Sequence, residues 1–433
     1  MRRLLLISPH FPPDGSAGTH RARVLAPALA EVGWTPLVLT VDARDYETDL
    51  DDELAQMVPA TVEVERCRAL PAAWTRAIGI GDLGLRALPG LWRAARRRLA
   101  RERFDAVYIT TYPVYPALLG PWIKRRFGMP FVLDVQDPWT GAWGLTVGGG
   151  PGGEPDVRSR LSRRAALALE RRVLPWADAL TGVSAALLDE LRARYPVLQT
   201  RPAAAVPIGL DLADVHWAAA RPRALPWLPA SPGTFTLCAV GTVVPLALDV
   251  LRTVLTGAAR LRASHPALAA LLRLIFVGTS NQARADAAAR VRPLADSLGV
   301  ADLVHEHPPR VPFADALRTL LSASAVLVLG SSEARYTASK MAPAVASGRP
   351  LLVVAHPESE MHRRAVTLDG ASVRAVACPS ATAADDVSAV LADWIRQRPA
   401  ARPVGAAALD GLAAPDLARR VAAVLDAVVP ACR

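Results

Sequence analysis

The chain has 433 residues, of which 52% are hydrophobic and 21% are charged, so it can bury large cores and is not an intrinsically disordered protein. Its length predicts two domains. The four cysteines are widely spaced without a C-x-x-C pair, which argues against a zinc site and a disulfide framework and favours a reducing cytoplasm. No apolar run reaches the roughly 18 residues that a membrane-spanning helix needs.

The first half of the chain alternates short apolar runs with helical stretches. The first strand is expected at Leu4–Ser8, followed by a helix over about Thr19–Val32. Further strands are predicted in the runs TPLVLTV, DAVYITT, PFVLDVQD and ALTGVS. This rhythm is typical of a parallel sheet with crossover helices.

A basic segment lies within this first half. Arg76–Arg103 holds eight arginines against Asp82 and Glu102, although the whole chain has a net charge of only +10. Its run LRALPGLWRAARRRLARERF predicts a helical hairpin or a broken helix with one basic and one apolar face, which can lie on anionic lipid. A solvated arginine-rich face is the alternative. Nucleic acid is not expected as a partner, since no zinc finger, basic zipper or aromatic RNA-binding signature is present.

From Phe235 the strand–helix pattern starts again. Strands are predicted in the runs FTLCAVGT, LRLIFVGTS, LVHEHP, AVLVLG and PLLVVA, with helices near 246–264, near 313–322 and after Ser339. This second array implies a second Rossmann-like domain. The Pro- and Ala-rich segment between the two arrays is predicted to be an irregular connector, with the boundary near Pro207.

The loop after the first strand, SPHFPPDGSAGTHRAR, has the composition of a ligand loop. Gly15 and Gly18 let the backbone approach a ligand, and the following helix offers free N–H groups to an anion. The loop is not a G-x-G-x-x-G, so contact with a phosphate or a sugar is favoured over a dinucleotide. His10, His20 and Arg21 flank it; His10 is equally well explained as a turn residue beside two prolines.

The strand FVLDV is followed by Gln136 and Asp137. In doubly wound sheets ligands bind beyond the carboxyl ends of the strands, so these two side chains are candidates for substrate contact. Asp137 could accept a proton or bind a sugar hydroxyl, whereas Asp134 inside the strand is interpreted as structural. The run VGGGPGGEP at 147–155 is predicted to be a flexible loop rather than a phosphate cradle, because no lysine accompanies it.

In the second array, AVGT and FVGT each close a strand, and Gly241 and Thr242 open a loop as a phosphate site requires. The segment SSEARYTASKMAPAVASGRP places Lys340 at the start of a predicted helix, whose N–H groups and dipole favour a phosphate. The alternative is a solvated Lys340 behind an N-cap residue. His305 and His307 lie on one face of a strand without a third ligand, so no metal site is expected.

These motifs, in this order along nearly the whole chain, resemble the nucleotide-sugar glycosyltransferases of the GT-B fold, particularly family 4-like members. The resemblance implies two Rossmann-like α/β domains that face each other across a cleft. It implies an acceptor domain at 1–206, a donor domain at 207–405 and a C-terminal helix, at 406–433, that crosses back to the first domain.

Two segments carry the resemblance residue by residue. VPIGLD is similar to the family's PNGVD turn, with Ile208 in place of Asn. SKMAPAVASGRP is similar to SK-x-x-E-x-x-A-x-G-x-P, but Pro343 stands where the family has a glutamate for the donor ribose. The family's basic pair after the Gly-Thr strand is also missing. The donor-binding residues that the resemblance and the motifs imply are Gly241, Thr242, Arg310, Glu333, Arg335, Tyr336, Thr337, Ser339 and Lys340.

The resemblance implies a retaining transfer of a sugar to a hydroxyl acceptor, with no cofactor and no metal, because Lys340, Arg335 and helix N-termini would replace a divalent cation. A role in cell-envelope polysaccharide, glycolipid or natural-product glycosylation is expected, with the protein in the cytoplasm or at the inner face of the plasma membrane. A catalytically silent binding subunit and a nucleotide-sugar epimerase are the alternatives. The expected catalytic residues are Asp137 and His10, and the expected acceptor-binding residues are Gly15, Gly18, His20, Arg21 and Gln136.

Overall fold

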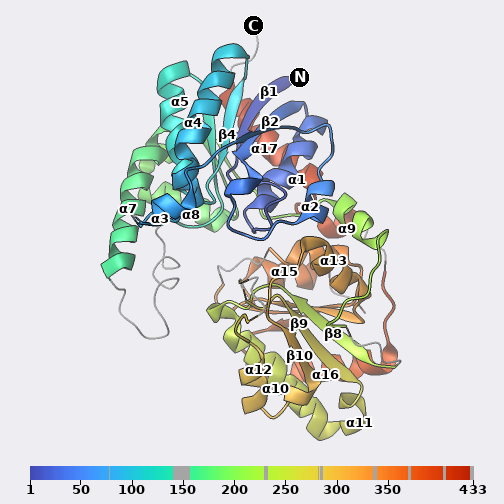
Figure 1. The fold of residues 1–433 in the computed structure, drawn as a ribbon. Helices are drawn as coiled ribbons and strands as arrows, with labels where there is room; N and C mark the ends of the chain where they lie inside the picture. The colour runs from blue at the N-terminus through green and yellow to red at the C-terminus, as the bar shows by residue number, and fades with distance from the viewer. Residues whose placement is uncertain are drawn as a thin grey trace. The chain divides into compact units, whose positions relative to one another are not determined.

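The computed structural model describes residues 1–77, 79–139, 157–228, 233–280, 282, 286–334, 339–368, 372–402 and 406–429, with the side chains of 157–163 and 406–407 left out. The chain divides into two units (Figure 1). The first unit comprises Met1–Gly209 and Ala414–Arg433, and the second comprises Leu210–Ala413. Both boundaries lie a few residues later than the sequence-based division at 206/207 and 405/406.

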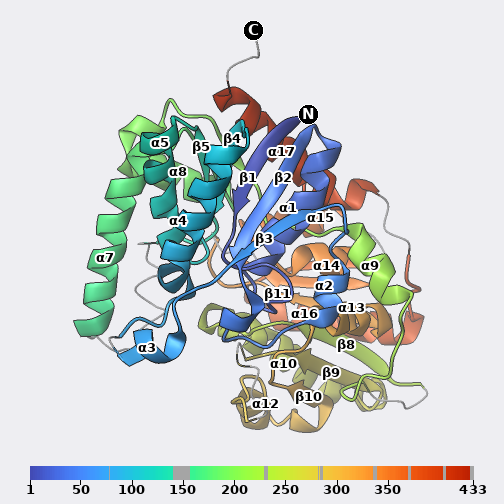
Figure 2. The same ribbon diagram turned by 45° about the horizontal axis from the view of Figure 1, so that its top comes forward.

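The first unit is built on a seven-stranded sheet in the order β3-β2-β1-β4-β5-β6-β7, and every neighbouring pair is parallel. Figure 2 shows β1, β2 and β3 side by side. The strands are β1 (Arg2–Ile7), β2 (Trp34–Val41), β3 (Glu63–Cys67), β4 (Ala106–Thr110), β5 (Phe131–Val135), β6 (Ala179–Gly182) and β7 (Ala203–Ala205). The helices are α1 (Thr19–Glu31), α2 (Asp52–Gln56), α3 (Ala72–Ala77), α4 (Leu83–Arg101), α5 (Leu119–Phe127), α7 (Val157–Val173), α8 (Ala185–Arg194) and α17 (Ala414–Val428).

Apolar residues cover both faces of this sheet. Leu5 and Ile7 point into a core shared with α4 and α5, while Leu4 and Leu6 point into a core shared with α1 and α17. All four side chains are fully buried. A strand buried on both faces reads as a continuous apolar run, as residues 4–7 of β1 do.

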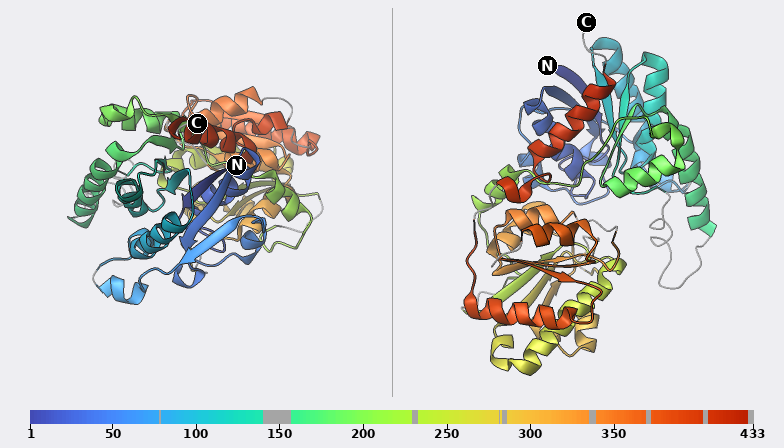
Figure 3. Two further views of the ribbon diagram at one scale, coloured as in Figure 1. Left: turned by 90° about the horizontal axis from the view of Figure 1, so that it is seen from above. Right: turned by 180° about the vertical axis from the view of Figure 1, so that it is seen from behind.

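The C-terminal helix belongs to the first unit, as the resemblance implies. Figure 3 shows α17, in red, beside the blue N-terminal elements. Leu417, Val421 and Leu425 lie in the core that α17 shares with α1. The Trp34 indole donates to the Asp426 carboxylate at 3.0 Å.

The second unit is built on a six-stranded parallel sheet in the order β10-β9-β8-β11-β12-β13. The two sheets therefore give the α/β class and the pair of Rossmann-like domains that the sequence predicts. The strands are β8 (Phe235–Val240), β9 (Leu272–Val277), β10 (Val304–His307), β11 (Ala325–Leu329), β12 (Leu351–Ala355) and β13 (Val373–Ala377). The helices are α9 (Leu212–Ala219), α10 (Leu248–Ser264), α11 (Pro266–Ala269), α12 (Arg292–Ser297), α13 (Phe313–Ser322), α14 (Met341–Ala346), α15 (Glu360–Thr367) and α16 (Ala383–Gln397).

The segment after Pro207 is irregular in part, as its composition predicts, but it contains one helix, α9. Asp211 caps α9 by accepting a hydrogen bond from the Ala213 N–H at 2.9 Å. Further along, the buried Trp227 indole donates to the Thr319 hydroxyl on α13 at 2.9 Å. The prediction missed α9, whereas residues 220–228 form no helix or strand and are held through the burial of Trp227 against α13.

The basic segment also differs from its prediction. A single helix, α4, runs from Leu83 to Arg101 with Pro89 inside it, in place of a hairpin or a broken helix. The Asp82 carboxylate caps this helix by accepting from the Leu85 N–H at 2.9 Å. Gly90 faces the Arg68 carbonyl so closely that a Cβ would lie 2.1 Å from its oxygen. The Pro-Gly pair thus permits a close approach and does not end the helix.

The packing of α17 against the core predicts how much a truncation in this helix should destabilise the protein. Leu425 is fully buried, so Leu425→Ala should lower the free energy of unfolding by about 2–5 kcal/mol, because it leaves a cavity in the core. Ala423→Ser, at an exposed position of the same helix, is the matched control and should change stability by less than about 0.5 kcal/mol. Urea unfolding of both variants measures the difference. Equal stabilities would show that α17 does not contribute to the core.

Candidate functional site

The turn after β1 holds a histidine against a buried carboxylate. His10 Nδ1 lies 2.5 Å from Asp14 Oδ2, and the Asp14 side chain is inaccessible to solvent. The same carboxylate accepts hydrogen bonds from the hydroxyls of Ser16 at 2.5 Å and Thr19 at 3.2 Å, and a further one from Thr48. Three hydroxyls therefore fix the orientation of the carboxylate that binds His10.

These partners also decide the charge of Asp14. Burial on its own would raise the pKa of the carboxyl group, but the hydrogen bond and the charge of His10, with the hydroxyls of Ser16 and Thr48, lower its pKa to about 2. Asp14 is therefore a carboxylate at neutral pH and can only accept hydrogen bonds.

Two tyrosines flank the His10 ring. The Tyr46 ring is stacked, with its centroid at 6.2 Å, and the Tyr112 ring is tilted, with its centroid at 5.7 Å. A Cβ at Gly18 would lie 2.3 Å from Tyr112 Cδ1, and a Cβ at Gly15 would lie 2.9 Å from the Asp49 carbonyl oxygen. Close packing thus requires glycine at both positions, and contact of Gly15 and Gly18 with an acceptor stays a prediction.

Arg21, another predicted acceptor contact, lies inside the first unit. Its side chain is 1% exposed and forms an ion pair with Asp134 at 3.1 Å. Its guanidinium also donates to the carbonyls of Val206 at 2.5 Å and Pro207 at 2.9 Å. Both terminal nitrogens of Arg21 therefore bind protein groups of the first unit, while its role towards an acceptor stays a prediction. His20, at the start of α1, is partly buried.

Gln136 and Asp137 lie directly after β5, as predicted. Gln136 is 7% exposed, and among the described residues its amide Nε2 has no hydrogen-bond partner. The Asp137 side chain is exposed at the surface. Neighbouring protein atoms still remove part of the water around its carboxyl group, and this raises the pKa of Asp137. A buried amide without a partner is costly, so Gln136 is the stronger candidate for a ligand contact in this loop.

Sequence reasoning missed three residues at this edge. Asp14 sits in a Pro-Pro-Asp-Gly run that suggests only a turn, and Tyr112 and Asp82 belong to no motif. Burial raises the pKa of Asp82, which lies near enough to His10 for electrostatic attraction. Only the parallel sheet brings these residues together, since they follow different strands.

In the second unit, the first Gly-Thr turn meets Lys340. Gly241 has φ of +105°, and a Cβ there would lie 2.7 Å from Lys340 Cε. The Lys340 ammonium donates to the Thr242 carbonyl oxygen at 2.5 Å. Three of the predicted donor-binding residues therefore form one contact, across a turn that favours glycine.

Lys340 is a cation without a carboxylate partner in the described part of the chain. Burial lowers its pKa to about 8, and no described acidic side chain offsets this. The helix that follows, α14, has only six residues, so the predicted contribution of its N-terminus to phosphate binding is small. Pro343 is the third residue of α14, where its missing N–H costs no intrahelical hydrogen bond.

The remaining predicted donor residues are less constrained. Arg310, Glu333 and Ser339 are exposed. The Arg310 backbone N–H donates to the Gln282 carbonyl at 2.9 Å, and the Glu333 N–H donates to the Ser331 hydroxyl at 3.0 Å. Arg335, Tyr336 and Thr337 lie outside the described residues, as does the glycine-rich run at 147–155.

The described residues contain no group of three or more His, Cys, Asp or Glu side chains arranged to hold a metal ion. The histidines of β10 have separate surroundings: His305 is exposed, and the His307 ring lies 4.8 Å from that of Trp227. Glu306 between them accepts hydrogen bonds from three backbone N–H groups before and at the start of α12.

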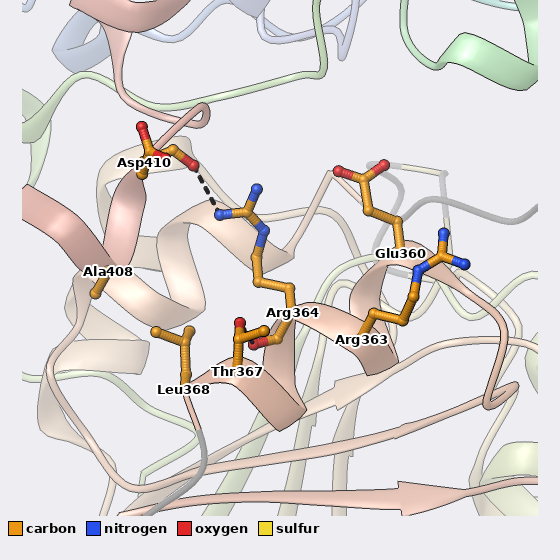
Figure 4. Close-up of a pocket in the computed structure, with 7 residues that line it drawn as sticks. All are labelled: Glu360, Arg363, Arg364, Thr367, Leu368, Ala408 and Asp410. Carbon is orange, nitrogen blue, oxygen red and sulfur yellow. Dashed lines mark hydrogen bonds between the residues drawn. The ribbon is translucent and has the colours of Figure 1, made fainter.

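One pocket of the second unit lies between α15 and the turn at 406–409 (Figure 4). Figure 4 shows Arg364 reaching the Asp410 backbone oxygen, to which it donates at 2.8 Å. No residue predicted to bind donor or acceptor lines this pocket, so it carries no argument about catalysis. Its lining residues are Glu360, Arg363, Arg364, Thr367, Leu368, Ala408 and Asp410.

The lowered pKa of Asp14 predicts a pH dependence of stability. A carboxyl whose pKa falls from 3.8 to about 2 on folding stabilises the protein above pH 3.8, and this contribution disappears as the pH falls through 2. Between about pH 5 and pH 2 the wild type should lose about 2 kcal/mol more than Asp14→Asn. Urea unfolding across this pH range measures it; parallel curves for the two proteins would contradict an ionised Asp14.

Part of the chain is similar in sequence to known glycosyltransferases. Residues 17–209 match the model of a glycosyl transferase 4-like domain. A D-inositol 3-phosphate glycosyltransferase of Salinispora arenicola is 29% identical in an alignment 328 positions long, which covers 71% of this chain and 67% of that protein.

Two solved structures share the fold. HepE of Anabaena, in complex with UDP-glucose, aligns with a TM-score of 0.59 at 12% identity over 99% of this chain and 100% of that one. WaaG, a glycosyltransferase of lipopolysaccharide biosynthesis, aligns with a TM-score of 0.55 at 16% identity over 99% and 100% of the two chains. The chain therefore has the two Rossmann-like units of the GT-B fold, and its residues 17–209 are similar to a glycosyl transferase 4-like domain.

Proposed function

We propose that the protein transfers a sugar from a nucleotide-sugar donor, bound by the second unit, to a hydroxyl acceptor bound by the first. The observation that carries this proposal is the partly buried Lys340 ammonium, which has a backbone carbonyl as its partner and no described carboxylate. A desolvated cation of this kind favours an anion. The complex of HepE with UDP-glucose supports a nucleotide sugar as the source of that anion.

The contacts of Lys340 indicate how it would act. An ammonium has three N–H donors, and the Thr242 carbonyl takes one of them. The remaining two are available to the oxygens of a diphosphate. Negative charge develops on the diphosphate as its bond to the sugar breaks, and a fixed positive charge nearby stabilises that leaving group most in the transition state.

A fixed ammonium removes the need for a divalent cation at the leaving group, and we therefore propose transfer that is independent of metal ions. The resemblance to family 4-like enzymes implies that the configuration at the anomeric carbon is retained. Pro343 cannot accept hydrogen bonds from a ribose, so the donor nucleoside would be held by other groups of the second unit.

The acceptor side of the proposal rests on the loop after β5. Gln136 Nε2 is buried without a partner among the described residues, so it can donate to a hydroxyl oxygen of an acceptor. The exposed Asp137 can accept from a hydroxyl or take its proton. The expected acceptor is a sugar or a lipid-linked sugar, as in cell-envelope polysaccharide, glycolipid or natural-product glycosylation.

Replacement of Lys340 tests the donor site. Lys340→Ala should weaken binding of a UDP-, GDP-, TDP- or ADP-sugar by about 10- to 100-fold, because charged hydrogen bonds to the diphosphate are lost. Lys124→Ala is the matched control, since Lys124 is the only other lysine and pairs with Asp178 in the first unit. Calorimetric titration with each donor class provides the affinities.

The alternatives give different results in the same experiments. If the wild type binds none of these donors, the proposed use of a nucleotide sugar is wrong. That result would favour a catalytically silent binding subunit. Turnover of a donor without any acceptor would favour an epimerase. A loss of activity in EDTA that Mg²⁺ or Mn²⁺ restores would contradict the proposed metal independence.

The structure reduces the number of arginines in the basic segment that could contact a membrane. Arg76, Arg86, Arg97 and Arg98 form ion pairs with glutamates, and Arg86 is buried, so these four have little charge left for lipid. The other four arginines of the segment are exposed and form no ion pair with a described residue; they are Arg93, Arg96, Arg101 and Arg103. No described helix is long and apolar enough to cross a membrane.

We propose that these four arginines hold the enzyme at an anionic lipid surface, where a lipid-linked acceptor would lie. Arg93→Glu/Arg96→Glu should weaken co-sedimentation with vesicles of 30% phosphatidylglycerol in phosphatidylcholine by about 30-fold or more, at roughly 1 kcal/mol for each charge. Arg252→Glu/Arg396→Glu, at exposed positions of the second unit, changes the net charge equally and should not weaken it. Equal losses in both variants would refute a specific lipid-binding face.

A further inference from the structure

The pocket beside α15 holds four charged side chains that do not pair with one another. It is lined by Arg363 and Arg364 and by Glu360 and Asp410, and all of its lining residues belong to the second unit. Glu360 and Arg364 have the i,i+4 spacing at which opposite charges commonly pair on a helix. Within the described part of the chain, however, none of the four takes part in an ion pair. Their charged groups are therefore available to a ligand.

The core of the second unit fixes the walls of this pocket. Met361 and Ala365 of α15 and Leu409 of the facing turn are buried in the same hydrophobic core. The Arg364 guanidinium donates to the Asp410 backbone oxygen at 2.8 Å, which ties the two walls together (Figure 4). The cavity of about 310 Å³ is thus formed before a ligand binds, and its volume lies at the lower end of the range of small-molecule sites.

The polar groups around the cavity include both hydrogen-bond donors and acceptors. Figure 4 shows the charged ends of Glu360, Arg363 and Arg364 on the same side of α15. Arg364 uses one donor for the Asp410 carbonyl, and its other N–H groups have no partner among the described residues. The Thr367 hydroxyl donates to the Arg364 carbonyl at 2.7 Å, so the Thr367 oxygen can still accept a hydrogen bond.

The balance of these charges indicates which kind of ligand fits. Two arginines and two carboxylates line the pocket, so its formal charge is zero. The carboxylates would repel an anion, and the guanidinium groups would repel a cation. A hydroxyl both donates and accepts, so neighbouring hydroxyls of a sugar can donate to a carboxylate and accept from a guanidinium at the same time. Leu368 and Ala408 pack partly against the core and offer apolar surface to the C–H groups of a sugar ring.

We infer that this pocket is a second carbohydrate site, which binds one neutral sugar unit through Glu360, Arg364 and Asp410. The inference goes beyond the proposed transfer, because binding here needs neither a nucleotide donor nor turnover. None of the residues proposed to bind the donor or the acceptor lines the pocket. The site holds a saccharide on the second unit without taking part in the reaction.

Saturation-transfer NMR of the full chain tests this site with defined probes. The probes are the methyl α- and β-glycosides of glucose, galactose, mannose and N-acetylglucosamine, which are neutral and carry a substituted anomeric oxygen, as in a glycan. At least one should bind the wild type with a dissociation constant on the order of 1 mM, as expected for a ligand of this size. Arg364→Met should weaken that binding by about 10-fold or more, because charged hydrogen bonds are lost. Arg252→Met, at an exposed position of α10, is the matched control and should not change it.

Replacement of Glu360 separates a sugar from an anion. Glu360→Gln keeps the size of the side chain and removes a negative charge, so it should weaken glycoside binding by about 10-fold, whereas an anion would bind more tightly to this variant. Glu360 is exposed, so the variant should fold even if Arg364→Met, which breaks the contact with Asp410, does not. Inorganic phosphate is the probe for an anion. Phosphate binding that is lost in Arg364→Met and strengthened in Glu360→Gln would overturn the inference.

Two further variants distinguish this inference from the proposed transfer. Lys340→Ala and Gln136→Ala change the proposed donor and acceptor contacts and should leave glycoside binding unchanged. A glycoside signal that is lost in either of these variants, but not in Arg364→Met, would come from a reaction site and would overturn the inference. Absence of binding by all of the glycosides would overturn it as well, while donor binding that depends on Lys340 would still stand. A wild type that binds a glycoside in this pocket but no nucleotide sugar would retain the second site and contradict only the proposed function.

Discussion

The parallel direction of the strands is the constraint on which the rest of this structure depends. Parallel strands need crossover helices, and both faces of each sheet are then covered and apolar. All carboxyl ends meet at one edge, where the side chains that follow β1, β4 and β5 come together in the first unit. In the second unit the same geometry brings the turn after β8 to Lys340, which follows β11.

Buried charges are balanced to different degrees in the two units. Arg21 and Asp134 form an ion pair inside the first unit, and both terminal nitrogens of Arg21 donate to backbone carbonyls. Lys340 has one carbonyl and no described carboxylate, so its charge is incompletely balanced. An incomplete balance at the edge of a sheet is a better indication of a binding site than charge alone.

Asp14 and His10 stand between these two cases. A network of the carboxylate and the hydroxyls holds Nδ1, and among the described residues no hydrogen bond reaches Nε2. This network is built from residues within ten positions of one another, with the single addition of Thr48.

The sequence by itself determined the two strand–helix arrays, the α/β class, the returning C-terminal helix and the loops that could carry chemistry, because apolar runs and their spacing are local properties. It also led to the prediction that Gln136, Gly241 and Lys340 bind ligands, because they follow predicted strands. It did not show the contacts that Arg21, Gly15 and Gly18 make with distant parts of the chain, and it missed Asp14 as a partner of His10. Only the tertiary structure decided which charges are balanced, since the partners of a buried group are chosen by packing between elements and not by their order in the sequence.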